Sequence, residues 1–226
     1  SDFTDGSDTE ARTGEDFHFN LSVEGNVSQG NVIFWYGTGN TTNLTMSYAD
    51  RYTASTEVPT DSLLPLNYYF AILTDTGWAY GPQTSVDVLD TIPPYFVDDH
   101  SDSVAYANYT FTFAMTAGDN IAVDGVSVIY TFGNGEFNET MTGTFTHSVA
   151  VPSGSNTLVY RFFIYDAAGN WFMTDSFDIS VIEGISYGDI LDTSDTNAQT
   201  GEFFNFQASI AHGSLLTQVH VVYWFG

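Results

Sequence analysis

Hydrophobic and polar residues alternate along residues 16–23, with the period of two that a β-strand imposes on its side chains. The apolar members, which fall on one face, are Phe17, Phe19, Leu21 and Val23. Polar side chains stand between them. Alternation of this kind is typical of an antiparallel strand with one buried and one solvated face.

The same pattern recurs along the chain, with turn signals of Gly, Pro, Asp and Asn about every 8–12 residues. The strands predicted in the first part of the chain are 16–23, 32–36, 43–48, 52–58, 67–74 and 85–89. Those predicted in the second part are 109–115, 125–132, 139–145, 148–151, 158–166 and 175–182. Two more, 203–210 and 219–225, come last. Because no stretch has an amphipathic helical period, the fold class is all-β: tandem immunoglobulin-like antiparallel β-sandwiches.

An internal repeat sets the domain organisation. Residues 14–19 read GEDFHF and residues 201–206 read GEFFNF, while a fainter copy lies between them, with YRFFI at 160–164 answering YYFAI at 68–72. Self-similarity of this kind indicates an array of modules. The predicted domains are module A at 1–91, module B at 92–183, and the N-terminal part of a further A-type module at 184–226, a truncated third module.

The third module is too short to supply a whole sandwich, and two explanations remain open. The sequence could be a piece of a longer array. Alternatively, a neighbouring copy supplies the missing strands, which would build a filament by strand complementation. Neighbouring modules or copies of the same chain are therefore the expected partners.

Charge limits the other partners. The chain holds 28 acidic residues against three arginines and no lysine, for a net charge of -25. Such a chain repels nucleic-acid phosphates and anionic membranes and attracts cations. It has no cysteine, which excludes disulfides and thiolate metal sites. No apolar run approaches the roughly 20 residues of a membrane span. We therefore expect no nucleic-acid partner and no membrane span in this segment.

Several motifs together carry a family resemblance. They are the DTIPP joint at 90–94, the Phe-x-Phe strands, the aromatic strand endings before Gly37 and Gly226, and the run YRFFIYDAAGNW at 160–171. These resemble the tandem Ig-like modules of large archaeal and bacterial surface proteins. Module A departs from the pattern, with LTDTG at 73–77 where YDAAGN would stand. The resemblance implies an extracellular or cell-surface location and a role in stalks, surface layers, adhesins or filaments.

Acidic and amide residues in predicted loops suggest a calcium site. The candidate ligands are Asp90, Asp119, Asn120, Asp124 and Asp166. In a sandwich the early and late turns gather at one end, where these oxygens could supply the six to eight ligands, roughly, that Ca²⁺ prefers. The alternative is that Asp and Asn stand there because they stabilise turns. Ca²⁺ is the one cofactor that the sequence suggests.

Six N-x-[ST] sequons favour a glycosylated surface protein, and possible glycans join the expected partners. Their acceptors are Asn20, Asn26, Asn40, Asn43, Asn108 and Asn138. Two pairs of tryptophans occupy recurring positions, Trp35 with Trp224 and Trp78 with Trp171. Recurrence favours a packing role in the core or on a sheet face, and sugar-stacking platforms are the alternative.

No catalytic motif is present: the five histidines are scattered, and HExxH, GxSxG and P-loop patterns do not occur. The sequence therefore predicts no enzyme. It favours a structural extracellular module array that forms a stalk, surface layer or filament. The alternative is a carbohydrate- or partner-binding module of a larger adhesin or secreted enzyme.

Overall fold

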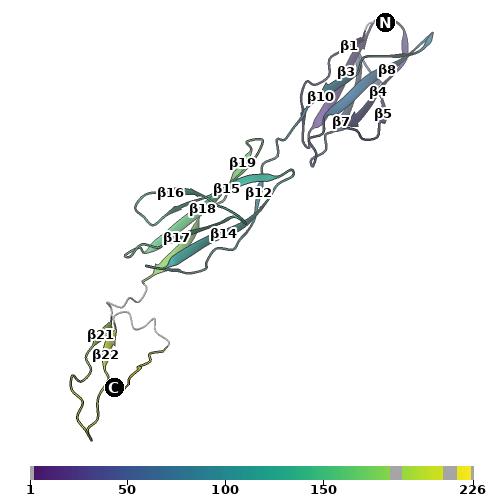
Figure 1. Cartoon of the computed structure of the whole chain (residues 1–226). Coiled ribbons are helices and arrows are strands. Elements are labelled where there is room, and N and C mark those ends of the chain that lie inside the picture. The colour runs from purple at the N-terminus through teal and green to yellow at the C-terminus, as the bar shows by residue number, and fades with distance from the viewer. Residues whose placement is uncertain (1–2, 184–189, 211–217, 225–226) are drawn as a thin grey trace. The chain divides into compact units, whose positions relative to one another are not determined.

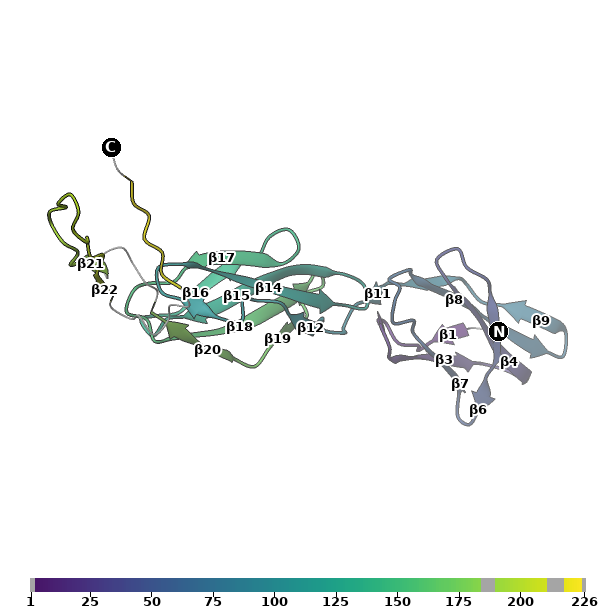
Figure 2. The ribbon, with the colours of Figure 1, turned by 90° about the horizontal axis from the view of Figure 1, so that it is seen from below.

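A computed structural model describes residues 3–183, 190–210 and 218–224, and within them the regular structure is β-strand (Figures 1 and 2). The described residues contain no helix long and apolar enough to cross a membrane. The first strands are β1 Phe3–Asp5, β2 Ala11–Arg12, β3 Asp16–Val23, β4 Val27–Tyr36, β5 Thr42–Thr45, β6 Ser47–Tyr48, β7 Tyr52–Glu57, β8 Leu66–Thr74, β9 Gly77–Tyr80, β10 Thr84–Val86 and β11 Val88–Leu89. They are followed by β12 Tyr95–Asp99, β13 Ala105–Tyr106, β14 Thr110–Gly118, β15 Val123–Thr131, β16 Phe137–Thr140, β17 Thr146–Ala150, β18 Thr157–Asp166, β19 Trp171–Met173 and β20 Phe177–Ile182. The last two are β21 Ile190–Asp192 and β22 Ala208–Ile210.

Contacts divide the chain into two compact units. The first comprises residues 1–98, 116–126 and 163–174, and the second comprises 99–115, 127–162 and 175–226. The loop ends of β14, β15, β18 and β19 thus belong to the first unit. All the predicted calcium ligands lie in the first unit.

The first sandwich, strands β1–β11, packs two antiparallel sheets face to face. One sheet has the order β1-β3-β7-β6; the other has the order β10-β8-β4-β5, with β9 also pairing β8. The alternation read from residues 16–23 is observed in β3, where Phe17, Phe19 and Leu21 are fully buried. Phe19 meets both Phe34 and Tyr68 of the facing sheet. Burying these aliphatic and aromatic faces holds the sheets together.

The second sandwich, strands β12–β20, repeats this plan. Its sheets have the orders β12-β14-β17 and β13-β20-β18-β15-β16, with β19 pairing β18. Both sandwiches also contain one short parallel pair. In the first, β2 and β11 form a separate two-stranded sheet, and in the second, β13 pairs β20 at the edge of the larger sheet. The predicted fold class, tandem Ig-like β-sandwiches, is confirmed by these sheets.

The two cores share one aromatic arrangement, which we call the aromatic triangle: two phenylalanines of one sheet and a tyrosine of the facing sheet. The triangles are Phe17, Phe19 and Tyr68 in the first sandwich and Phe111, Phe113 and Tyr160 in the second. Ring-centroid distances are 5.1, 5.9 and 5.1 Å in the first. The matching distances in the second are 5.0, 6.0 and 5.0 Å. The repeat read from sequence therefore reflects repeated packing.

Each triangle tyrosine also makes the same partly buried hydrogen bond. The Tyr68 hydroxyl donates to Asp5 Oδ2 at 2.8 Å, and the Tyr160 hydroxyl donates to Asp99 Oδ2 at 2.7 Å. Burial raises the pKa of Tyr68 to about 12 and also raises the pKa of Tyr160. Both tyrosines are therefore neutral donors that tie the first strand of each sandwich to the opposite sheet.

Three strand predictions in the sandwiches need correction. The strand predicted at 32–36 is longer than expected, because β4 begins at Val27 and crosses Gly30, beside which the Tyr52 ring packs. The predicted strand 43–48 is divided at Met46, where the chain leaves one sheet for the other. The predicted strand 139–145 is observed as β16, Phe137–Thr140, and the residues up to Phe145, whose φ of 56° lies outside the β region, form a turn and not a strand.

In the third segment, residues 190–210 and 218–224, β21 pairs β22 antiparallel. The predicted strand 203–210 is wrong before Ala208, and residues 219–224 of the predicted strand 219–225 are not strand. In the first sandwich the equivalent strand β4 is held between β8 and β5, whereas the described third segment contains no strand beside 219–224. A strand without a ladder partner has no backbone hydrogen bonds to fix it. The start proposed for this module, residue 184, lies outside the described residues.

Candidate metal centre

Three carboxylates from distant parts of the chain converge within the first unit. One oxygen each from Asp90, Asp119 and Asp166 lies within 4.8 Å of the others. Asp90 follows β11, Asp119 directly follows β14, and Asp166 is the last residue of β18. Oxygens that surround one Ca²⁺ at about 2.4 Å are separated by up to about 4.8 Å. The spacing therefore suits three ligands of a single cation.

Hydrogen bonds hold each carboxylate in place. Asp119 Oδ2 accepts the backbone N–H groups of Ile121 and Ala122 at 2.9 and 2.8 Å, which closes the turn after β14. Asp166 accepts two bonds from Asn170, one from its backbone N–H and one from its side-chain amide, both at 2.8 Å. Each aspartate therefore stabilises its own turn, as the alternative interpretation of the sequence expects.

Asp90 is held by residues from several loops. Its Oδ1 accepts bonds from the Thr13 hydroxyl at 3.1 Å, the Ile92 N–H at 3.2 Å and the Asn120 amide at 2.9 Å. The Asn120 amide also donates to the Thr60 carbonyl at 2.7 Å. Three chain segments thus meet at this carboxylate, and Asn120 links a fourth segment, at Thr60, to them.

Some oxygens at the centre have no hydrogen-bond partner. Asp119 Oδ1 and Asn120 Oδ1 are both inaccessible to water and both unbonded. Asp166 is only 4% exposed, and its two recorded donors belong to the neutral Asn170. A buried carboxylate is costly unless a positive charge or a metal offsets it. These observations, together with the spacing, fit a cation at this position.

The protein has no lysine, and no arginine balances these charges. Its three arginines each pair elsewhere among the described residues: Arg12 with Glu10, Arg51 with Asp50, and Arg161 with Glu136. Oxygen-only ligands of this type suit Ca²⁺ or another hard cation, not a thiolate- or imidazole-binding metal.

Sequence reasoning and the structure overlap only in part. Of the five predicted ligands, Asp90, Asp119, Asn120 and Asp166 meet at the centre, whereas Asp124 is exposed on β15 and is not in the three-carboxylate group. Asn170 was not among the predicted ligands, although its amide bonds both Asp166 Oδ2 and the Asp90 carbonyl. The sequence signal that could have identified Asn170 as a candidate ligand is its position in the turn AAGN, which directly follows Asp166.

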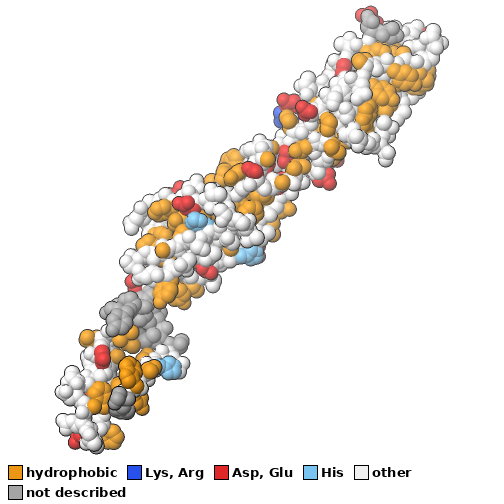
Figure 3. Space-filling view, viewed as in Figure 1, with side chains coloured by type: hydrophobic (Ala, Val, Ile, Leu, Met, Phe, Trp, Pro, Cys, Tyr) orange, Lys and Arg blue, Asp and Glu red, His pale blue; other side chains and the backbone are white. Residues whose placement is uncertain are grey.

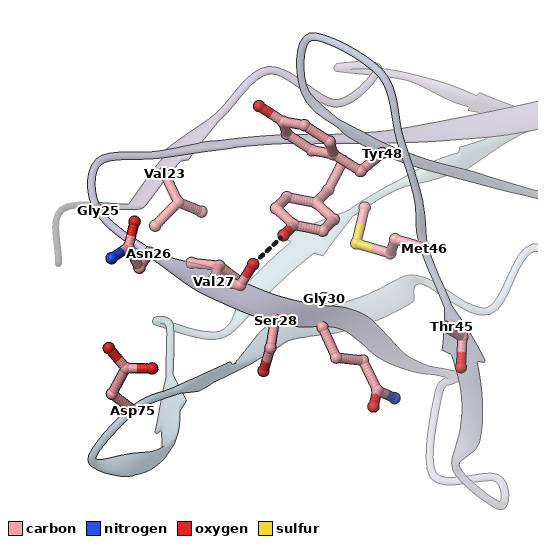
Figure 4. A pocket seen from close by; sticks show the side chains of 12 residues that line it. Val23, Gly25, Asn26, Val27, Ser28, Gly30, Thr45, Met46, Tyr48 and Asp75 are labelled. Atoms are coloured by element: carbon pink, nitrogen blue, oxygen red, sulfur yellow. Dashed lines mark hydrogen bonds between the residues drawn. The ribbon is translucent and has the colours of Figure 1, made fainter.

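A second site candidate is a surface cavity of about 710 Å³ in the first sandwich (Figure 4). The Tyr52 hydroxyl donates a hydrogen bond to the Val27 carbonyl at 3.1 Å. The ring of Tyr52 packs against Gly30. Asp75 is the only carboxylate among the described residues that line it. A lone carboxylate offers no acid–base pair, so the cavity lacks the groups of a hydrolytic site.

In the two sandwiches the tryptophans lie on outer sheet faces and not in the cores. Trp35 is half-buried with its ring centroid 6.2 Å from that of Tyr69, and Trp171 lies 5.7 Å from Phe163. Trp78 and Trp171 are 45% and 57% exposed. These positions match the sheet-face form of the packing prediction and also leave aromatic surface open to a ligand.

Five of the six sequon asparagines are exposed to solvent, and Asn20 is partly buried. The exposed ones are Asn26, Asn40, Asn43, Asn108 and Asn138. Asn43 Oδ1 also accepts a hydrogen bond from the buried Asn31 at 2.8 Å. A glycan on Asn43 would be attached to its Nδ2 and would leave this Oδ1 acceptor in place.

The fold and this centre define a class: a tandem array of Ig-like β-sandwiches with an oxygen-lined acidic centre. No family model and no curated protein matches the chain. Among solved structures, the fibronectin(III)-like modules of Clostridium thermocellum CbhA align with a TM-score of 0.36 and 18% identity, covering 80% of this chain and 95% of that one. The FN1-FN3 domains of chicken CNTN1 align with a TM-score of 0.35 and 9% identity, covering 77% and 65%. The fold assignment rests on the sheets and cores described above.

Proposed function

We propose that this chain is a structural part of an extracellular module array that forms a cell-surface stalk, surface layer or filament, with no catalytic role. The observation that carries the proposal is the repetition of one sandwich, down to the aromatic triangle and its Tyr–Asp bond. Enzymes gain little from repeating a core, whereas arrays use repeated units to build length. The resemblance to surface-protein modules from archaea and bacteria agrees with this role.

The proposed modules are residues 1–91, 92–183 and 184–226. Electron microscopy of the native assembly tests the proposal, because an array predicts extended particles with a regular axial repeat. Dispersed monomers of one chain at high concentration would refute the structural role.

A bound Ca²⁺ is part of this proposal. We propose that Asp90, Asp119, Asn120 and Asp166 hold the ion, with carboxylate oxygens and the unbonded Asn120 Oδ1 as ligands. The ion would fasten the Pro-Pro connector at 90–94 to the loops at 119–120 and 166–170. A connector fastened in this way resists bending, which suits a load-bearing array.

We further propose that the exposed sequons carry glycans. Peptide mass spectrometry of native material, before and after enzymatic deglycosylation, would detect them. A native protein without mass additions at any of the six acceptors would refute this part.

The second candidate is a module that binds carbohydrate or a partner surface. The exposed aromatics Trp78, Tyr80 and Trp171 favour it. Binding to a panel of polysaccharides, lost in Trp78→Ala or Trp171→Ala without a change in melting temperature, would support the second candidate over the first.

A further inference from the structure

Two of the six sequons occupy one position of the repeated sandwich. The sequences NLTM and NETM begin at Asn43 and Asn138. Asn43 pairs with Ile33 between β5 and β4, and Asn138 pairs with Ile129 between β16 and β15. The two isoleucines are equivalent, because each directly precedes the ring that packs on the second phenylalanine of the aromatic triangle. The two sequons therefore belong to the repeated structure and not to a variable loop.

The residue that ends each of these motifs is buried in the core. Met46 and Met141 are each 5% exposed, whereas the sequon threonines, Thr45 and Thr140, are exposed. Asparagine and threonine stand two residues apart on a strand, so both side chains of each sequon lie on the outer face of the sheet. The core methionine thus holds the strand, and the acceptor remains open to solvent.

Both motifs lie on an edge strand of the larger sheet. In the first sandwich β5 is the last strand of the order β10-β8-β4-β5, and in the second β16 is the last strand of β13-β20-β18-β15-β16. Each pairs on one side with its neighbour, and no described strand pairs with its other side. An edge of this kind offers backbone N–H and C=O groups to a strand of another molecule.

The usual protections of an edge strand are weak here. Natural edges are often blunted by lysine or proline, but the chain has no lysine, and β5 and β16 contain no proline. Glu139 is the only charged residue of the two strands. In the view of Figure 3, hydrophobic and acidic side chains are exposed on both sandwiches, and basic side chains are almost absent.

Net charge protects these edges only at low salt. The charge of -25 makes copies of the chain repel one another. Salt screens this repulsion, since the Debye length falls from about 8 Å at physiological ionic strength to about 3 Å at 1 M. A bulky neutral group on the strand would protect the edge at any salt concentration.

We propose that Asn43 and Asn138, here called the paired sequons, carry N-linked oligosaccharides, and that these glycans prevent a further strand from adding to β5 and β16. A strand added to either edge would lie about 4.8 Å away, in space that the bulky glycan occupies. The inference rests on the proposed glycosylation of the exposed sequons, and adds a role that the other acceptors do not share.

The modification itself uses the amide nitrogen of each asparagine. The Nδ2 atom forms a bond to the anomeric carbon of an oligosaccharide carried on a lipid phosphate. The bond from that carbon to the phosphate oxygen breaks, the amide gives up one proton to the solvent, and the lipid phosphate leaves. At Asn43 the hydrogen bond from Asn31 is accepted by Oδ1, so this contact does not compete for the nitrogen.

The test removes the paired sequons without changing either asparagine. In the variant Thr45→Ala/Thr140→Ala both acceptor side chains remain, including the Asn43 oxygen that bonds Asn31. Wild type and variant are produced in the native host, and mass spectrometry of their glycopeptides determines which acceptors are occupied. We expect glycans on Asn43 and Asn138 in the wild type and on neither in the variant.

Analytical ultracentrifugation in 1 M salt, roughly, then compares self-association while charge repulsion is screened. We expect the variant to associate at a concentration about tenfold lower than the wild type does. Amide hydrogen exchange should slow at 42–45 and 137–140 in the associated variant, because new strand pairs protect these backbone groups. Contacts of the array itself are present in both proteins and do not contribute to the difference.

The variant Thr42→Ala/Thr110→Ala is the matched control. It makes the same substitution at two exposed strand threonines and removes the sequons of Asn40 and Asn108. Both of these asparagines lie outside the strands. Loss of their glycans should leave self-association at the level of the wild type.

The inference is overturned if either paired sequon is unoccupied while other acceptors carry glycans. It is also overturned if the two double variants associate equally, or if neither associates more than the wild type. A native protein without a glycan at any acceptor would overturn the proposed glycosylation, and this inference with it. None of these outcomes bears on the axial repeat that tests the array.

Discussion

Removing the proposed calcium ion should destabilise the first unit, and the charges at the centre give the size of the effect. Two unit charges 4.8 Å apart repel by about 1 kcal/mol in water and about 3 kcal/mol at an effective dielectric constant of ~20. Three carboxylates make three such pairs, with no arginine beside them. An ion present at about a hundred times its dissociation constant offsets this repulsion and adds roughly 2.7 kcal/mol of stability.

For a domain of roughly 100 residues this stabilisation corresponds to about 10–20 °C in melting temperature. Differential scanning calorimetry in millimolar Ca²⁺ and in excess chelator measures it directly. We expect the transition of the first unit to fall by this amount in chelator and to recover when Ca²⁺ is restored.

Asp119→Asn separates the loss of the ion from the loss of the turn. An asparagine keeps an oxygen to accept the Ile121 and Ala122 N–H groups, but it removes one charge. In Ca²⁺ the variant should melt below the wild type. In chelator the order should reverse, because two of the three repulsive pairs are gone.

Asp87→Asn is the matched control, because Asp87 is exposed and lies three residues before Asp90. It removes the same charge and should leave the response to Ca²⁺ intact. Melting temperatures that are equal in Ca²⁺ and chelator, with Asp119→Asn behaving as Asp87→Asn does, would refute the calcium site.

Three further substitutions and one pH dependence concern the cores. Tyr68→Phe should cost about 1 kcal/mol in urea unfolding, since it removes the bond to the exposed Asp5, which water can then solvate; an unchanged midpoint would argue against that bond. Because the pKa of Tyr68 is raised to about 12 from an ordinary value of about 10, its contribution is complete below pH 10. It should fall by about 1.4 kcal/mol per pH unit between pH 10 and 12, a loss that Tyr68→Phe would remove. Phe113→Ala should cost about 3–5 kcal/mol by leaving a cavity in a fully buried site. Gly30→Ala should cost about 1–3 kcal/mol in the same assay, because its Cβ would lie 2.6 Å from the Tyr52 ring; a neutral result would mean that the ring moves freely.

The strands were the most predictable part of the protein. Residues 16–23 form β3 with the predicted bounds, and β8 and β18 each differ from prediction by one residue at their start. Alternation is a local property, because each residue's face depends only on its position in the strand. The recurrence of Phe-x-Phe and Tyr-x-Phe in both sandwiches likewise predicted a repeated core.

Features that depend on neighbours were not predictable in this way. The strand predicted at 219–225 has the right residues but is absent from 219–224, since no described strand pairs with it. The break at Met46 arises because the chain changes sheets there. Strand pairing depends on the whole sandwich, so the sequence of a single segment does not predict it.

The candidate centre shows the same division. Sequence alone determined the all-β class, the acidic surface, the repeat and the kinds of oxygen ligands available on loops. Only the tertiary structure decided that Asp90, Asp119 and Asp166 meet while Asp124 does not. These residues are far apart along the chain, and their convergence depends on how β11, β14 and β18 end in space. The packing of the buried rings fixes where these strands end, and the strand ends in turn place the carboxylates.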